Sequence, residues 1–273
     1  MSLVEIEIDS KVKVADLFLN RPEKLNAFNP QLIKDFTEGF DSLVANPDVS
    51  CIVISGRGRA FSTGYDMSRR DQPVDERPSS PSIVAAWQGA KAGINIWLHV
   101  RDVPIPVISA VHGYAFGAAQ MLATNSDIVV VADDAVFGWA GVRGGGGWLG
   151  PAMAFYGHHR RAREMELRYG RFTGKQAWEI GWANYSVPAE EVLPLAHELA
   201  EEVARTPRET LAIKKAAFNL VLDNMGYRQV IDLAATWNTI AHRSEQSAVG
   251  DAHVDEVGLR AALREDAELR ASR

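Results

Sequence analysis

Phe61-Ser62-Thr63-Gly64-Tyr65-Asp66 and, further along the chain, His112-Gly113-Tyr114-Ala115-Phe116-Gly117-Ala118-Ala119-Gln120-Met121 are the two stretches on which the fold prediction rests. Each follows a short apolar run of β-type residues, Cys51–Ser55 in the first case and Pro106–Val111 in the second. Such a run ending at a glycine-containing segment is typical of a buried strand that passes through a turn into a helix. Each stretch alone is more typical of a turn that only packs. Two turns whose free main-chain N–H groups converge would hold an oxyanion.

A third stretch, Asn20-Arg21-Pro22-Glu23-Lys24-Leu25-Asn26-Ala27-Phe28, precedes these two turns. The order and spacing of the three stretches resemble those of the crotonase (enoyl-CoA hydratase/isomerase) superfamily, from Leu17 to about Asn184. The resemblance implies an α/β fold, a crotonase-like spiral of ββα units with a C-terminal helical domain. It also implies that the main-chain N–H groups of Tyr65 and Ala118 form an oxyanion hole for the thioester carbonyl of an acyl-CoA.

The resemblance further implies which residues surround the substrate. Coenzyme A enters as part of that substrate, so no prosthetic group is expected. Trp139 is expected in an apolar acyl pocket, although an aromatic residue near glycine runs is equally typical of a core. The expected substrate-binding residues are Lys24, Leu25, Ala27, Thr63 and Asp66 beside the CoA portion, together with Gly64, Met67, Gly117, Met121, Trp139 and Gly141.

Both acidic residues that the family's hydratases use are replaced in this chain. Hydration of an alkene needs one group to activate water and another to protonate the α-carbon. The first family glutamate corresponds to Met121 and the second to Gly141, and a further acid position used by relatives corresponds to Leu149. A positioned acid or base is worth roughly 10²- to 10⁴-fold in rate, and one oxyanion donor about 10²- to 10³-fold. Ordinary crotonyl-CoA hydration is therefore not expected to be efficient.

The remaining candidates for proton transfer each have a structural interpretation. His112 is expected to support its turn by hydrogen bonds, Tyr114 to pack, and Asp66 to contact CoA or hold its loop. Arg143 is expected in an exposed salt bridge, although it could also meet a substrate oxyanion. Segment 68–82 is interpreted as a surface loop or as a lid over the acyl group. Its acids complete the candidates: Asp71, Asp75 and Glu76.

Composition limits the classes of protein to which the chain can belong. Its 273 residues, 47% hydrophobic and 23% charged, can bury one substantial core. A net charge of −6 argues against nonspecific nucleic-acid binding and against an anionic membrane surface. The single cysteine, Cys51, cannot form an internal disulfide, and no apolar run approaches the roughly 18 residues of a membrane span. Without a secretion signal at the start, a cytoplasmic location is expected. His158-His159 lacks the spaced partners of a zinc helix, so no metal is expected.

Hydrophobic periodicity predicts the remaining elements. Leu3–Ile8 and Val12–Leu19 are predicted as a hairpin, and short strands are predicted at Ile128–Val131 and Val136–Trp139. Beyond Asn184 the strand signals fade and helices follow one another. Helices are predicted at Pro30–Ala45, Ile83–Val100, Trp148–Tyr156, Arg160–Tyr169, Glu191–Arg205, Pro207–Asp223, Tyr227–His242 and Val254–Glu268.

This pattern predicts a ββα core at residues 1–190 and a C-terminal helical domain at 191–273. In the proteins that the chain resembles, the corresponding helices pack between subunits, which implies a homotrimer or a dimer of trimers. The apolar residues of the 207–223 helix are equally consistent with packing on the chain's own core. They include Ile213, Ala217, Leu220 and Val221.

The resulting hypothesis is an acyl-CoA-processing enzyme that stabilises a thioester enolate or a tetrahedral oxyanion on a bulky or unusual acyl group. Water-dependent C–C cleavage, thioester hydrolysis and decarboxylation remain open, because each can use the hole with fewer carboxylates. The alternative class is a non-catalytic acyl-CoA binder, which the loss of Glu at positions 121 and 141 would also produce.

Overall fold

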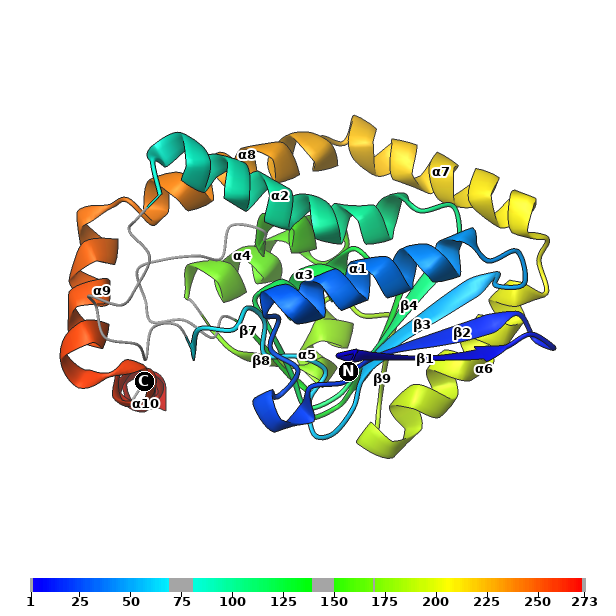
Figure 1. Cartoon of the computed structure of the whole chain (residues 1–273), viewed down its shortest axis with the longest axis horizontal. Coiled ribbons are helices and arrows are strands. Elements are labelled where there is room, and N and C mark those ends of the chain that lie inside the picture. Colours follow the sequence, from blue (N-terminus) through cyan, green and yellow to red (C-terminus); the bar gives the residue numbers. More distant parts are fainter. Residues whose placement is uncertain (1, 69–80, 139–149, 169, 272–273) are drawn as a thin grey trace.

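The computed structural model describes residues 2–68, 81–138, 150–168 and 170–271, and Figure 1 shows their arrangement. The strands are β1 (Val4–Asp9), β2 (Val14–Leu19), β3 (Cys51–Gly56), β4 (Val107–Val111), β5 (Tyr114–Phe116), β6 (Ile128–Ala132), β7 (Val136–Gly138), β8 (Phe172–Thr173) and β9 (Tyr185–Val187). The α-helices are α1 (Pro30–Ala45), α2 (Ile83–Asp102), α3 (Ala118–Thr124), α4 (His159–Leu167), α5 (Gly174–Glu179), α6 (Val192–Ala204), α7 (Arg208–Asn224), α8 (Tyr227–Ala241), α9 (Glu245–Val257) and α10 (Leu259–Ala271). Short 3₁₀ helices lie at Pro22–Lys24, Gly150–Phe155 and Ala189–Glu191.

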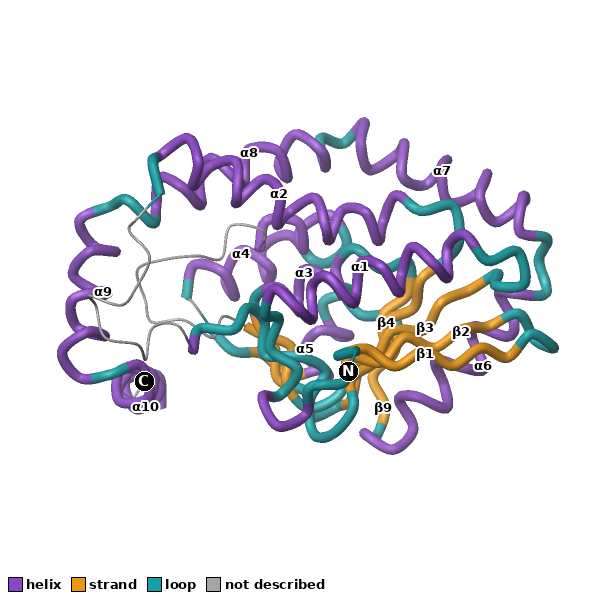
Figure 2. The backbone as a smooth tube through the Cα atoms, viewed as in Figure 1, coloured by secondary structure: helices purple, strands orange, loops and turns teal. Residues whose placement is uncertain are grey.

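The strands form two sheets. The large sheet has the order β1-β2-β3-β4-β6-β9, and the small sheet has the order β5-β7-β8. The hairpin pair β1–β2 is antiparallel, whereas the other neighbours in the large sheet are parallel. The large sheet forms an orange fan in Figure 2. Consecutive strands β4 and β5, and then β6 and β7, join different sheets, so the chain winds as a spiral of strand-strand-helix units. The predicted α/β spiral is therefore confirmed.

Helix α1 illustrates how local sequence positions a layer. Asn29 precedes the helix, and its side-chain oxygen accepts a hydrogen bond of 2.7 Å from the N–H of Leu32. The apolar residues then recur at helical spacing on one face, and they are buried against β1 and β2. In the view of Figure 1, α1 lies above the large sheet and α6 lies below it. The buried residues of α1 are Leu32, Phe36, Phe40 and Leu43.

The C-terminal helices make different contacts. Helix α6 packs on the large sheet, and its Val192, Ala196 and Ala200 belong to the main core. Helix α8 packs along α2. The single helix predicted at Val254–Glu268 is wrong, because Gly258, with a φ of +82°, separates α9 from α10 and the helical segment begins earlier. The domain boundary at residue 190 stays a prediction.

A buried ammonium group fastens α7 to the end of α2 and to the loops that precede β4 and β6. Lys215 Nζ lies 2.6 Å from a carboxylate oxygen of Asp127 and donates to the carbonyl oxygens of Val100 and Ile105, at 3.3 and 3.0 Å. The Lys215 side chain is only 4% exposed. Each of its three protons thus has an acceptor, as a buried ammonium requires.

The outer face of α7 and α8 remains apolar and exposed to solvent. We call this surface the outer apolar face, and its exposed residues are Ile213, Phe218, Leu220, Val221, Met225, Leu233, Trp237 and Ile240.

None of the described helices combines the length and the apolar composition needed to cross a membrane.

Candidate functional site

The two turns singled out in the sequence meet in space. The N–H of Ser62 donates to the carbonyl oxygen of Tyr114 at 3.0 Å, and the N–H of Phe116 donates back to the Ser62 carbonyl at 3.1 Å. A Cβ atom built on Gly64 would lie 3.3 Å from the main-chain nitrogen of Ala118. The turn that carries Gly64 is therefore packed directly against the start of α3.

The main-chain N–H groups of Tyr65 and Ala118 are free of protein acceptors in the described residues. On one side of Tyr65, the N–H of Phe28 donates to Gly64 O at 2.7 Å, and the N–H of Asp66 donates to Phe28 O at 3.0 Å. This parallel pairing uses the atoms of the residues before and after Tyr65 and leaves its own N–H unused. Ala118 is the first residue of α3, where a helix has no internal acceptor for the N–H.

Asn26 supports the first turn through hydrogen bonds to its main chain. Its buried side chain donates to the carbonyl oxygens of Arg57 and Ala60, at 2.9 and 2.8 Å. The Ser62 hydroxyl in turn donates to Asn26 O at 2.7 Å and accepts from the N–H of Gly64 at 3.1 Å. Asn26 lies in the quoted Asn20–Phe28 stretch, but the sequence alone did not indicate its supporting role.

Asp66 is engaged in an ion pair. Its Oδ2 lies 2.6 Å from Arg21 Nη1, and its Oδ1 accepts from the N–H of Ser68 at 2.9 Å. Burial raises the pKa of Asp66, but the hydrogen bonds from Ser68 and Arg21 outweigh it and hold the pKa below its ordinary value. The carboxylate is therefore ionised at neutral pH and paired with Arg21. In this state it holds its loop in place and is not available for proton transfer.

The residues expected beside CoA are brought together by a main-chain contact. The N–H of Thr63 donates to Leu25 O at 3.1 Å, and Ala27 O accepts from Arg21 Nη1 at 3.0 Å. Lys24 is exposed at the end of its 3₁₀ helix, next to Leu25. Lys24, Leu25, Ala27 and Thr63 thus form one rim beside the first turn.

Met67 leaves this rim and packs against the C-terminal helices. It contacts the small cluster formed by Val254, Leu259 and Ala262, which joins α9 to α10. The end of the chain is thereby linked to the residue that follows Asp66.

A cavity of about 330 Å³ opens beside the two turns. Tyr65 of the first turn and Met121 of the second stretch belong to its wall. Most of the wall comes from α2 and α8, whose part in the site the sequence did not indicate. No carboxylate is found among the described residues of the wall, which are Ile33, Tyr65, Gly89, Ala90, Gly93, Ile94, Ile96, Met121, Ala234 and Asn238.

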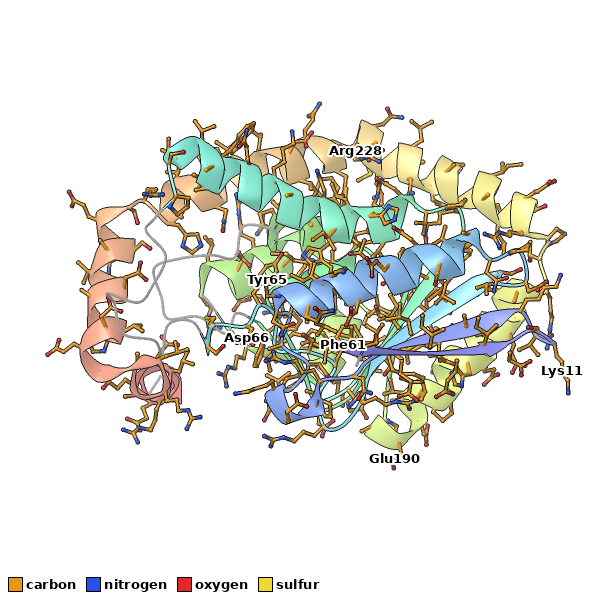
Figure 3. All side chains as sticks on the ribbon, viewed as in Figure 1. Lys11, Phe61, Tyr65, Asp66, Glu190 and Arg228 are labelled. Carbon is orange, nitrogen blue, oxygen red and sulfur yellow. The ribbon has the colours of Figure 1, made fainter. Side chains whose placement is uncertain are left out.

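The side chain of Tyr65 is held by a buried indole. Trp97 Nε1–H donates to the Tyr65 hydroxyl at 3.1 Å, and Trp97 itself is fully buried beside Phe28 and Phe36. Figure 3 labels Tyr65 and Asp66 near the amino end of α1. Partial burial of the side chain raises the pKa of Tyr65, with the Trp97 hydrogen bond acting in the opposite sense. The phenol is therefore protonated at neutral pH.

The other sequence candidates do not enter this cavity in the described structure. His112 Nε2 lies 3.0 Å from the carbonyl oxygen of Gly58, and the Tyr114 ring packs 5.5 Å from that of Phe116. No group of three metal-binding side chains occurs within the described ranges. Several candidates lie outside the described residues: Trp139, Gly141, Arg143, Leu149, Asp71, Asp75 and Glu76.

Known proteins resemble this chain in sequence and in fold. Residues 9–250 match the family described as enoyl-CoA hydratase/isomerase. The 1,2-epoxyphenylacetyl-CoA isomerase of Escherichia coli strain K12 is 31% identical over 237 residues, which span 85% of this chain and 87% of that protein. The hydroxycinnamoyl-CoA hydratase-lyase of Pseudomonas fluorescens is 29% identical over 218 residues, 79% of this chain and 77% of that protein. A solved enoyl-CoA hydratase from Mycobacterium smegmatis has the same fold, with a TM-score of 0.85 at 24% identity, covering 98% of this chain and 94% of that chain.

Proposed function

This chain belongs to the enoyl-CoA hydratase/isomerase family, and from that membership we propose that it transforms an acyl-CoA thioester held at Tyr65 and Ala118. The thioester carbonyl oxygen accepts hydrogen bonds from both main-chain N–H groups. The observation that carries the proposal is the contact between the two turns, which brings Gly64 against the nitrogen of Ala118 while leaving both N–H groups free.

The two donors act on the charge that develops during the reaction. Removal of a proton from the α-carbon, or attack on the carbonyl carbon, moves negative charge onto the thioester oxygen. Fixed N–H groups stabilise that charge without having to reorient, and losing one of them costs about 10²- to 10³-fold in rate. The hole therefore supports chemistry through an enolate or a tetrahedral oxyanion.

Proton transfer distinguishes this chain from a crotonyl-CoA hydratase. Met121 is half-buried in the cavity wall, where its thioether can neither accept nor release a proton. Together with Gly141, which replaces the second glutamate, this argues for a reaction other than ordinary hydration. An isomerase or lyase reaction is the leading form of the proposal. C–C hydrolysis, thioester hydrolysis and decarboxylation are its rivals, because each draws on the same hole.

The acyl group is proposed to be bulky, with a group that contains a six-membered carbon ring as the first choice. The names of the two relatives carry ring-containing acyl groups, epoxyphenylacetyl and hydroxycinnamoyl. The cavity beside the two turns is walled by apolar side chains such as Ile33, Ile94 and Met121, which suit an apolar ring.

Mass spectrometry of a panel of acyl-CoA thioesters tests the proposal. We expect at least one thioester to be converted, and the mass of the product separates isomerisation, hydration, hydrolysis and loss of CO₂. Ala118→Pro removes one N–H at the first position of α3, where proline fits a helix, and should lower turnover by about 10²- to 10³-fold. Failure of every CoA ester to bind would end the proposal.

A non-catalytic acyl-CoA binder is the second candidate. The lack of a carboxylate among the described cavity residues is the observation that favours it. Tight binding of an acyl-CoA that is recovered unchanged after long incubation would support a binder, whereas repeated turnover would exclude it.

The outer apolar face is proposed to be covered by other copies of this chain in a homotrimer or a dimer of trimers. Phe218 is 74% exposed and Ile213 is 71% exposed, so α7 leaves these side chains to solvent in the single chain. Light scattering after size exclusion measures the assembly. Phe218→Ser should shift it towards smaller species, and a monomeric wild-type protein would contradict this part of the proposal.

A further inference from the structure

The cavity wall contains a phenol whose proton has no acceptor in the described part of the chain. The Tyr65 oxygen already accepts the N–H of Trp97 at 3.1 Å, which leaves the phenol O–H as a donor. That donor belongs to an otherwise apolar wall, in which Asn238 is the one other polar side chain among the described residues.

Two further contacts fix where this hydroxyl lies. Trp97 is fully buried between other rings, so its N–H is a rigid anchor. On the α2 wall, a Cβ atom built on Gly93 would come within 3.0 Å of the Tyr65 hydroxyl oxygen. The absence of a side chain at position 93 thus gives the phenol tip its place beside the cavity.

The same residue would serve the substrate at two points. Its main-chain N–H is proposed to bind the thioester carbonyl oxygen, and the same residue belongs to the cavity wall. A group that meets the phenol therefore belongs to the acyl part of the thioester and lies beyond its carbonyl carbon.

We propose that the Tyr65 phenol is a specificity-determining hydrogen-bond donor, which makes the cavity select acyl groups that carry an oxygen acceptor over the corresponding hydrocarbon acyl groups. This inference rests on the proposed function, because it needs an acyl-CoA in the cavity. A phenol with the ordinary tyrosine pKa of about 10 is protonated at neutral pH, and burial raises the pKa of Tyr65 further, so its O–H is available as a donor.

The expected selectivity is modest. Tyr65 is 43% exposed, so water can also accept from the phenol when the acyl group offers no oxygen. One neutral hydrogen bond in such a position is worth roughly three- to tenfold in affinity. A fully enclosed donor would discriminate much more strongly, because nothing else could satisfy it.

Calorimetric binding to matched pairs of thioesters tests the inference. One series compares butyryl-CoA with acetoacetyl-CoA, whose additional carbonyl can only accept, and with 3-hydroxybutyryl-CoA. The other compares phenylacetyl-CoA with its 2-, 3- and 4-hydroxy derivatives. In the wild-type protein, at least one oxygen-bearing member should bind roughly three- to tenfold more tightly than its parent.

Tyr65→Phe removes the hydroxyl and keeps the main-chain N–H, so the affinity ratio within each pair should fall to about one. Gly93→Ala keeps the hydroxyl but displaces it, and should also reduce the ratio. Tyr185→Phe is the matched control, because Tyr185 is 41% exposed on β9 and should leave the ratio unchanged.

The outcomes separate this inference from the proposed function. Equal binding of parent and oxygen-bearing thioesters overturns the inference alone, as does a preference that survives Tyr65→Phe, which would assign the recognition to Asn238. Failure of every thioester to bind overturns the proposed function and the inference together.

Discussion

Gly64 lies directly against the main chain of Phe116, where a Cβ atom at position 64 would come within 2.4 Å of the Phe116 carbonyl oxygen. Gly64 also has a φ of +83°, which residues with a side chain rarely adopt. This contact determines how closely the turn of Tyr65 approaches the start of α3. Only glycine leaves room for it.

Gly64→Ala should therefore lower turnover of an acyl-CoA by about 10²-fold or more, because the added methyl group pushes the two N–H groups apart. Gly258→Ala is the matched control, since Gly258 has a φ of +82° and no atom within 4 Å of an added Cβ. Gly258→Ala should lose about 1 to 3 kcal/mol of stability through backbone strain alone, whereas Gly64→Ala should lose more, because the added methyl group also overlaps the Phe116 carbonyl oxygen. Kinetics and urea denaturation measure both effects, and equal turnover in the two variants would contradict the prediction.

Loss of the buried ammonium group should destabilise the fold. We expect Lys215→Met to lower the free energy of unfolding by about 3 kcal/mol or more, because the Asp127 carboxylate loses its partner. Lys214 is exposed on the same helix, so Lys214→Met should change stability by no more than about 0.5 kcal/mol. Urea denaturation compares the two variants, and similar midpoints would show that the buried pair does not stabilise α7.

The pair of His197 and Asp16 should make stability depend on pH. Their side chains lie 2.7 Å apart, and the hydrogen bond to Asp16 raises the pKa of His197, with Glu201 and Glu7 adding to the effect. A histidine whose folded pKa is raised stabilises the fold fully below its unfolded pKa of about 6.5 and loses that effect as pH rises through the folded value.

Asp16→Asn should therefore cost more stability at pH 5.5 than at pH 9. The difference should be at most about 1 kcal/mol, because the His197 side chain is 38% exposed and solvent screens the pair. Thermal unfolding across this pH range measures it. A cost that grows towards alkaline pH would have the wrong sign for this mechanism.

Cys51 should be unreactive in the folded protein. Burial raises the pKa of its thiol to about 12, so hardly any thiolate forms at pH 8. Iodoacetamide labelling followed by mass spectrometry should detect no modification of the native protein and complete modification in denaturant. Rapid labelling under native conditions would show that β3 opens locally.

The sequence predicted those features that local rules decide. Helix α1 was predicted at its observed bounds, because Pro30 begins it and apolar residues recur at helical spacing after it. Both turns could be located from Gly64 and Gly117 after apolar strands. Gly258 falls inside the single helix predicted at Val254–Glu268, because glycine within a helical pattern is often tolerated, whereas in the structure it separates α9 from α10.

The cavity could not be predicted in the same way. Its wall depends on how α8 packs along α2, and periodicity shows that a helix has an apolar face without showing what that face meets. Trp97 illustrates this limit. In sequence it is one of several apolar residues near the end of a helix, and only the folded chain brings its indole to the Tyr65 hydroxyl.

The two turns are joined through peptide groups of Ser62, Tyr114 and Phe116, and such groups are present whatever side chains the neighbouring positions carry. Positions 65 and 121 can thus be exchanged while the frame stays intact. In the proposed function, main-chain groups bind the thioester carbonyl that all acyl-CoA substrates share, whereas the neighbouring side chains decide which reaction follows. A new reaction therefore requires new side chains and leaves the scaffold unchanged.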